Sequence, residues 1–235
     1  MPVAASAETV VFIPGLTCTG ALFGPQINSL KERPIILAET CDLDTIEAMA
    51  ERLLDHAPET FALLGLSLGG YIALEMIRQA PERVSRLALM NTNARDDTLA
   101  QTQLRQTQMA IVKKGGFHKI AAMQYPQLVH PARHDDTTLR QIIYDMADEV
   151  GPESYLKQQN AIIHRKDQRP HLSAIKCPTM IVAGEEDSLL PLDRCREMHE
   201  AIPHSELHII PDCGHMSTLE HPAHTSELIQ DWLSS

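Results

Sequence analysis

A serine lies between small residues at the end of a buried strand, in the pentapeptide Gly65-Leu66-Ser67-Leu68-Gly69. An apolar run over residues 61–64 precedes it, and a helix-like stretch over 71–76 follows. A serine at the tip of so sharp a turn has a strained backbone and an exposed hydroxyl, and the neighbouring glycines let strand and helix approach closely. The pattern predicts Ser67 as a nucleophile. An ordinary glycine-rich turn is the alternative interpretation.

Such a serine needs an acid and a base. Because a serine hydroxyl is a weak nucleophile at neutral pH, an imidazole must remove its proton and a buried carboxylate must orient the imidazole. Asp187 lies in the loop that directly follows an apolar strand over 180–183, at a sheet edge where functional loops gather. We therefore predict Asp187 as the acid. Glu185 and Glu186 compete for the role, and an acidic loop exposed to solvent is the alternative.

His215, one of twelve histidines in the chain, follows the last predicted strand and precedes the last predicted helix. Gly214 would let this loop bend and bring the ring toward Ser67. The order serine, aspartate, histidine along the chain then places all three side chains on loops at one sheet edge. A loop histidine without partners is the alternative.

The negative charge that develops on a substrate carbonyl oxygen during acyl transfer needs two fixed N–H donors. The backbone amide of Leu68, directly after the serine, is the first. The second is expected in the loop after the first strand, Pro14-Gly15-Leu16-Thr17-Cys18, where we predict the Leu16 amide, with a simple tight turn as the alternative. Cys18 and Cys213 flank the site, and we expect both to be buried, unreactive thiols.

These loops require a scaffold of parallel strands. Six short β-rich runs alternate with helical patterns, which predicts an α/β fold with a mainly parallel sheet and helices on both faces. The predicted strands cover residues 9–13, 35–38, 61–66, 84–91, 180–183 and 206–210. Asp44-Thr45-Ile46-Glu47 resembles a capping box that opens a helix through Leu54. A final helix is expected from Pro222 to near Leu233.

The connection from about residue 92 to 175 is far longer than a crossover between parallel strands requires. We predict a helical cap over residues 94–175, inserted after the strand that ends near Asn91, and a core formed by residues 1–93 and 176–235. Asp96 and Asp97 can cap a first helix that ends at 113–116. A second helix carries an apolar stripe, typical of packing, that consists of Leu139, Ile142, Ile143, Met146, Ala147 and Val150.

Composition limits the class of protein. The chain has 235 residues, with 31 acidic and 20 basic side chains and a net charge of −11. This charge repels phosphate backbones and anionic membranes, so neither nucleic acid nor membrane is an expected partner.

The start of the chain has no basic or apolar leader pattern, and five cysteines fit reduced thiols, which predicts a cytoplasmic protein. The histidine pairs His130/His134 and His204/His208 have metal-ligand spacing, but their context favours surface side chains, and no metal is predicted.

The motifs together resemble the α/β-hydrolase superfamily, in the branch of small bacterial carboxylesterase-like and enol-lactonase-like enzymes with a helical cap. The resemblance covers nearly the whole chain, and it implies hydrolysis of an ester-like bond without a cofactor. Two departures stand out: Pro14-Gly15 replaces the His-Gly of many relatives, and residues 38–42 lack their Asp-x-Pro-Gly-x-Gly segment. The motifs are 12–16, 65–71, 80–84 leading into 87–89, 184–187, Gly214-His215 and Glu220-His221-Pro222.

The sequence therefore predicts a serine hydrolase of a small-molecule carboxylic ester or lactone, working through Ser67, His215 and Asp187 with the Leu16 and Leu68 amides as oxyanion donors. The same residues serve thioesterases, C–C bond hydrolases, acyltransferases and perhydrolases, and a slow-turnover ligand receptor is the rival from another class. The cap is expected to make a largely apolar pocket, and a homodimer is left open. Its predicted substrate contacts are Met109, Met123, Tyr125 and Leu128.

Overall fold

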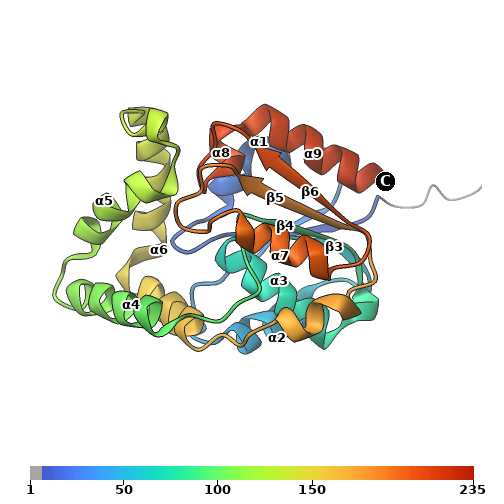
Figure 1. Cartoon of the computed structure of the whole chain (residues 1–235), viewed down its shortest axis with the longest axis horizontal. Helices are drawn as coiled ribbons and strands as arrows, with labels where there is room; N and C mark the ends of the chain where they lie inside the picture. The colour runs from blue at the N-terminus through green and yellow to red at the C-terminus, as the bar shows by residue number, and fades with distance from the viewer. Residues whose placement is uncertain (1–6) are drawn as a thin grey trace, which may run out of the picture.

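Six strands form one parallel sheet, as the sequence predicts, and their order is β2-β1-β3-β4-β5-β6 (Figure 1). This computed structural model describes residues 7–235. Residues 1–6, on which part of the leader argument rests, lie outside the described residues. The strands are β1 (Val10–Ile13), β2 (Ile35–Leu37), β3 (Phe61–Leu66), β4 (Val84–Met90), β5 (Thr179–Gly184) and β6 (Ser205–Ile210).

The central strands are apolar on both faces, because alternate side chains enter two separate cores. In β1, Val11 and Ile13 pack in one cluster while Val10 and Phe12 pack in the other. Strands buried on both sides read as continuous apolar runs, which explains why they were predictable.

Helices cover both faces of the sheet (Figure 1). Residues of α2, α3 and α7 pack in the first cluster, and residues of α1 and α9 pack in the second. The core helices are α1 (Gly24–Ser29), α2 (Ile46–His56), α3 (Leu68–Gln79), α7 (Asp193–Ala201), α8 (Ser217–Glu220) and α9 (Pro222–Ser234), with 3-10 turns η1 (Gly20–Phe23), η2 (Pro81–Arg83) and η4 (Arg169–Ala174). None of the helices within residues 7–235 is long and apolar enough to cross a bilayer.

The strand order places a topological switch point between β1 and β3. The chain leaves β1 toward β2 on one side and returns to β3 on the other side. Loops at the carboxyl ends of the strands diverge at such a point and leave a crevice for a ligand. The loop after β1 and the turn after β3 are the two segments from which the sequence analysis predicts oxyanion donors and nucleophile.

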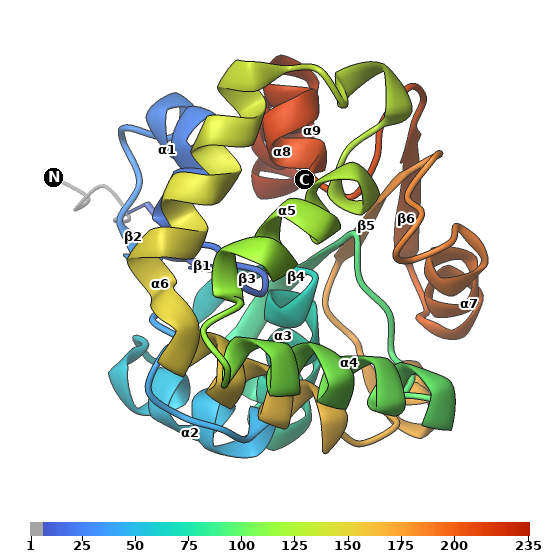
Figure 2. The same ribbon diagram turned by 90° about the vertical axis from the view of Figure 1, so that its left-hand side faces the viewer.

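Three helices and a 3-10 turn between β4 and β5 form the cap: α4 (Leu99–Val112), α5 (Phe117–Leu128), η3 (Pro131–Arg133) and α6 (Thr137–Ile163). They pack against one another beside the core, and Figure 2 shows them in front of the sheet. Gly151, at φ 74°, interrupts α6 directly before Pro152. Most apolar residues before the break pack in the second cluster and those near the end of α6 pack in the first, while Ala147 and Tyr155 share a third cluster. The helix therefore bridges both layers of the core.

Two helix caps differ from the sequence prediction. Thr45, not Asp44, caps α2 by accepting a hydrogen bond from the Ala48 amide. Thr98 caps α4 in a capping box with Gln101, so Asp97 is not needed there and pairs with arginines instead. Both threonine and aspartate are favourable N-cap residues, with aspartate slightly preferred, so the local sequence does not decide between neighbours of these two types.

Candidate active site

Ser67 occupies the tight turn between β3 and α3 with φ 55° and ψ −114°, a conformation that non-glycine residues rarely adopt. Its backbone is held on both sides, because its N–H donates to the Met90 carbonyl at 3.0 Å and its carbonyl accepts from Thr92 Oγ1 at 2.8 Å. A side chain at Gly65 would collide with the backbone of Gly69. The turn therefore needs glycine there, and the Ser67 hydroxyl makes no bond to its own helix.

Asp187 and His215 meet in a buried contact, with Asp187 Oδ2 and His215 Nδ1 2.7 Å apart. Asp187 lies in the loop after β5, and its other oxygen, Oδ1, accepts the backbone amides of Leu189 and Leu190 at 3.0 and 2.9 Å. Every acceptor position of this carboxylate faces a donor, so its orientation is fixed. Of the competing acids in the loop, Glu185 and Glu186 are both exposed.

His215 faces a cavity of about 530 Å³ that Ser67 also lines. Because Nδ1 is engaged by Asp187, Nε2 is the ring nitrogen left for that cavity. The backbone N–H of His215 donates to the carbonyl of Leu128 at 3.0 Å, so the end of α5 anchors the histidine loop. The structure thus places Ser67 and His215 on one cavity, with Asp187 in contact with the histidine ring.

The loop after β1 lies against the serine. A Cβ on Gly15 would lie 3.5 Å from the Cβ of Ser67, and Leu16 lines the same cavity. Within residues 7–235 the backbone N–H groups of Leu16 and Leu68 have no hydrogen-bond partner. Two unpartnered amides next to a cavity are available to a ligand oxygen.

Gln158 of the cap supports this loop, and the sequence analysis did not identify it. Its side chain is fully buried, accepts from the Thr17 amide at 3.0 Å and donates to Thr40 Oγ1 at 3.0 Å. Thr17 has φ 56°, so the loop conformation is strained and needs this support. A glutamine more than a hundred residues away in the sequence gives no local signal of such a role.

Asn91 is a second residue that the sequence analysis missed. It follows β4 with φ 43°, a left-handed conformation that asparagine tolerates. Its Nδ2 donates to Asp187 Oδ2 at 3.1 Å and to the Gly214 carbonyl at 3.2 Å, while its Oδ1 accepts from Ser217 Oγ at 2.6 Å. Asn91 thereby ties the acid to the histidine loop. Its place at a strand end, where functional side chains gather, was the available signal.

Glu220 anchors the histidine loop from its other side. This buried carboxylate accepts the amides of Gly214 and Met216 through Oε1, at 3.1 and 3.2 Å, and the amide of His130 through Oε2 at 2.7 Å. It belongs to the Glu-His-Pro motif of the sequence analysis, which assigned it no role. The bonds join the histidine loop to the cap segment after α5.

The four cap residues predicted to contact substrate lie in different environments. Leu128 lines the cavity, whereas Met109, Met123 and Tyr125 are not among its lining residues. Met123 is 56% exposed, and Tyr125 is buried with its hydroxyl donating to the Arg133 and Asp136 carbonyls at 2.8 and 3.1 Å. Tyr125 therefore organises the cap itself, because a buried hydroxyl needs a partner.

The cavity is more polar than the sequence predicts. Core residues supply an apolar side that includes Leu66 and Met216, but the cap supplies amide and guanidinium groups. Leu104, Leu128 and Ile162 of the cap also line the cavity, so its cap side is mixed rather than largely apolar. The polar cap residues of the lining are Gln101, Arg105, Gln108, Gln124 and Gln127.

The Cys18 thiol lines the cavity. Burial raises the pKa of this thiol to about 12, so the cysteine stays a neutral thiol.

A group of potential metal ligands lies near the site but does not line the cavity. Ligand atoms of His130, Glu186 and Asp212 lie within 4.8 Å of one another. Glu186 already accepts the Cys213 amide at 3.0 Å, so this carboxylate has a structural partner.

The family follows from comparison with known proteins. A family model described as alpha/beta hydrolase fold matches residues 22–222, which is most of the chain. The protein therefore belongs to the α/β-hydrolase fold family, in agreement with the resemblance in the sequence. Together with the relatives below, the match makes it a hydrolase of that type.

The relatives are hydrolases of several kinds. RutD of Shigella flexneri, named as a candidate carbamate hydrolase, is 25% identical over 255 residues that cover 100% of this chain and 94% of RutD. A thermophilic esterase from Thermogutta terrifontis is 25% identical with a TM-score of 0.88, covering 98% of this chain and 90% of the esterase. The enol-lactonase of Burkholderia xenovorans LB400 shares the fold with a TM-score of 0.89 at 22% identity, covering 98% and 93%.

Proposed function

We propose that this hydrolase is a serine hydrolase of a carboxylic ester or lactone, with Ser67 as nucleophile, His215 as general base and Asp187 as the acid that orients it. The observation that carries the proposal is the 2.7 Å contact between Asp187 Oδ2 and His215 Nδ1, beside a cavity lined by both His215 and the strained Ser67. This arrangement suits activation of an alcohol by a neutral imidazole.

The proposed reaction has two half-reactions. Ser67 Oγ attacks the carbonyl carbon while His215 Nε2 takes its proton, and the carbonyl oxygen becomes an oxyanion that the Leu16 and Leu68 amides stabilise. Asp187 stabilises the imidazolium without itself becoming protonated. The C–O bond then breaks, and His215 returns the proton to the leaving alkoxide. Water attacks the acyl group on Ser67, with His215 again accepting and returning a proton, and the acid is released.

A carbamate is the second candidate substrate, because the RutD relatives match the full chain and are named for that activity. Carbamate and ester carbonyls pass through similar tetrahedral intermediates, so the same serine could act on both. The thermophilic esterase, at the same identity, supports the ester. Parallel rates on matched p-nitrophenyl esters, lactones and carbamates distinguish these candidates.

Labelling with a fluorophosphonate tests the activated serine without knowledge of the substrate. We expect one covalent adduct on wild-type protein, mapped to the peptide that contains Ser67, and sustained hydrolysis of at least one ester or lactone. His215→Ala should slow the labelling strongly, because the hydroxyl then keeps its proton. An adduct on another residue, or a single turnover followed by tight ligand binding, would contradict the proposed enzyme and favour a receptor.

Asn91 is proposed as a positioning residue, and replacing it tests the link between acid and histidine loop. Asn91→Ala should lower kcat about tenfold with little change in KM, because the loss of its bonds to Asp187 and Gly214 loosens the imidazole rather than the substrate. Steady-state kinetics measure both constants. Asn91→Gly is the matched variant, since glycine accepts the positive φ without strain. Equal losses of kcat in the two variants would attribute the effect to the missing Asn91 side chain. A loss of kcat in Asn91→Ala alone would attribute it to backbone strain and contradict the positioning role.

A cytoplasmic location is part of the proposal. All five cysteines are free, and burial raises the pKa of those at the core, Cys18, Cys195 and Cys213. A set of unpaired thiols supports a reducing compartment.

A further inference from the structure

We propose that Arg105 forms a subsite for a carboxylate on the substrate, so that the preferred ester or lactone is an acid at its far end. The reaction on such a substrate rests on the proposed function, whereas the binding of a carboxylate to Arg105 does not depend on it. Arg105 lies on α4 of the cap and is the one permanently charged side chain among the described residues that line the cavity. It provides a positive group inside a protein with a net charge of −11.

The charge of Arg105 is only partly neutralised. Its Nε lies 2.7 Å from Asp97 Oδ2, and Arg165 Nη1 lies 2.5 Å from the other oxygen of the same carboxylate. Two guanidinium groups therefore share one carboxylate, which leaves one net positive charge. Asp97 is buried, so the excess charge is poorly screened by water.

Arg165 cannot present this charge to a ligand. Its side chain is 4% exposed, lies over the Tyr71 ring at 4.3 Å and donates to the carbonyls of Arg95 and Ile162. The side chain of Arg105 is 21% exposed, and its Nη2 has no hydrogen-bond partner within residues 7–235. The excess charge is therefore presented to the cavity by Arg105.

A buried glutamine determines which groups surround Arg105. A guanidinium only donates, so the atom of Gln159 that meets Arg105 Nη1 at 2.9 Å must be its Oε1. Gln159 Nε2 then donates to Tyr155 Oη at 2.8 Å and to Gln108 Oε1 at 3.4 Å. With its oxygen used, Gln108 has its amide N–H groups left for the cavity it lines.

The subsite therefore offers donors and a positive charge, with its acceptors already paired. Such a set matches a carboxylate, which accepts hydrogen bonds and carries negative charge. A cavity of about 530 Å³ lies within the usual range for small ligands and holds both an ester group at Ser67 and a second polar group under the cap. The substrate class is a monoester or lactone of a short dicarboxylic acid.

Turnover of two matched esters tests the subsite in the enzyme. Mono-p-nitrophenyl glutarate and p-nitrophenyl pentanoate have the same acyl length and differ in the terminal carboxylate. We expect Arg105→Gln to lower the ratio of their kcat/KM values, glutarate over pentanoate, about 30-fold, equivalent to about 2 kcal/mol. Arg105→Lys should restore part of the ratio. Rates are taken after subtraction of uncatalysed hydrolysis, and an unchanged ratio in Arg105→Gln would overturn the subsite.

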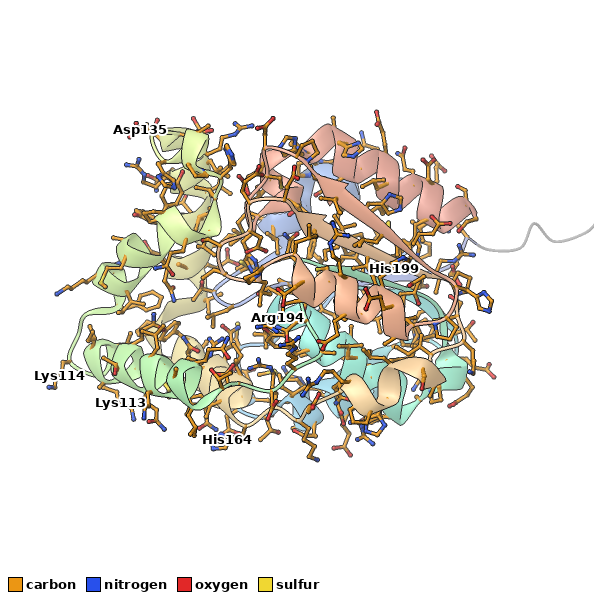
Figure 3. The ribbon with its side chains drawn as sticks, in the orientation of Figure 1. Lys113, Lys114, Asp135, His164, Arg194 and His199 are labelled. Atoms are coloured by element: carbon orange, nitrogen blue, oxygen red, sulfur yellow. The ribbon has the colours of Figure 1, made fainter. Side chains whose placement is uncertain are left out.

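A charge control separates the subsite from the general field of the protein. Lys113→Gln removes one positive charge from the exposed outer end of α4, where Figure 3 places its side chain away from the core. This variant should leave the glutarate to pentanoate ratio within about twofold of wild type, because exposed charges at a distance are screened. A fall as large as that in Arg105→Gln would attribute the preference to net charge and overturn the subsite.

Binding to a variant that cannot react separates the subsite from the proposed function. Calorimetry on Ser67→Ala should show that the ester mono-p-nitrophenyl glutarate binds at least tenfold more tightly than the ester p-nitrophenyl pentanoate. This difference should be lost in Ser67→Ala/Arg105→Gln. If the wild-type protein cleaves no ester but this difference is found, the subsite stands and the proposed reaction fails. If Ser67-dependent cleavage is found but glutarate binds no better than pentanoate, the reaction stands and the subsite fails.

Discussion

Replacing Ser67 with alanine should lower kcat at least about 10⁴-fold, because no other group at the turn can form the acyl intermediate. Ligand binding should persist, since the cavity and the two unpartnered amides remain. The measurement is the rate of p-nitrophenyl ester hydrolysis by purified variant, with binding of a product acid followed in parallel. Retention of more than about one hundredth of the wild-type kcat would contradict the assignment of the nucleophile.

Ser188 provides the matched control, because it is another serine that lines the same cavity. Its hydroxyl donates to the Gln127 carbonyl at 3.0 Å, so it is engaged with the cap and lies far in the sequence from the strained turn. Ser188→Ala should lower kcat by less than about tenfold. A loss of kcat comparable to that of Ser67→Ala would contradict Ser67 as the sole nucleophile. The strained turn would then no longer identify the nucleophile.

Much of the fold was predictable because its signals are local and strong. Both faces of β1 and β3 are buried, so each strand is a continuous apolar run that needs no partner to be recognised. The tight turn at Ser67 was predictable for a similar reason. Close approach of strand and helix excludes side chains at Gly65 and Gly69, and this exclusion is visible in the residue types.

The details of the cap could not be predicted from periodicity. An amphipathic helix shows which of its faces is apolar, but not whether the polar face meets solvent or a cavity. Tyr125 was expected to contact substrate, yet its ring packs edge-on against Tyr144 at 6.1 Å and its hydroxyl bonds the cap backbone. Arg105 and Gln108 on α4 were not singled out from the sequence, and both line the cavity.

The hydrogen bonds that hold the site together could not be predicted from the sequence, although the strand-end position of Asn91 marked that residue as a candidate. Gln158 supports the loop after β1 across 141 positions, and Asn91 bonds Asp187 across 96 positions. Hydrogen bonds of this kind depend on where distant segments meet, and a single sequence does not contain that information. Residue type and order along the chain predict Ser67, Asp187 and His215 as catalytic, whereas they gave no prediction of these supporting residues.

Asp187→Asn should lower kcat about 10⁴-fold while leaving the fold intact. The two backbone amides of Leu189 and Leu190 point at one oxygen of Asp187, so an asparagine must place its carbonyl oxygen there. Its NH₂ group then faces His215 Nδ1, which can accept that bond only by giving up its proton. The proton moves to Nε2, and the nitrogen that faces the cavity becomes a donor that cannot deprotonate Ser67.

Steady-state kinetics measure this loss, and nitrogen NMR of the labelled imidazole reports the tautomer directly. Glu185→Gln is the matched control, because it removes the same charge from an exposed position in the same loop and should change kcat by less than about twofold. Equal losses in the two variants would mean that the loop acts through its net charge. A proton that stays on Nδ1 in Asp187→Asn, together with wild-type kcat, would remove Asp187 from the mechanism, because its contact with His215 would then only support the fold.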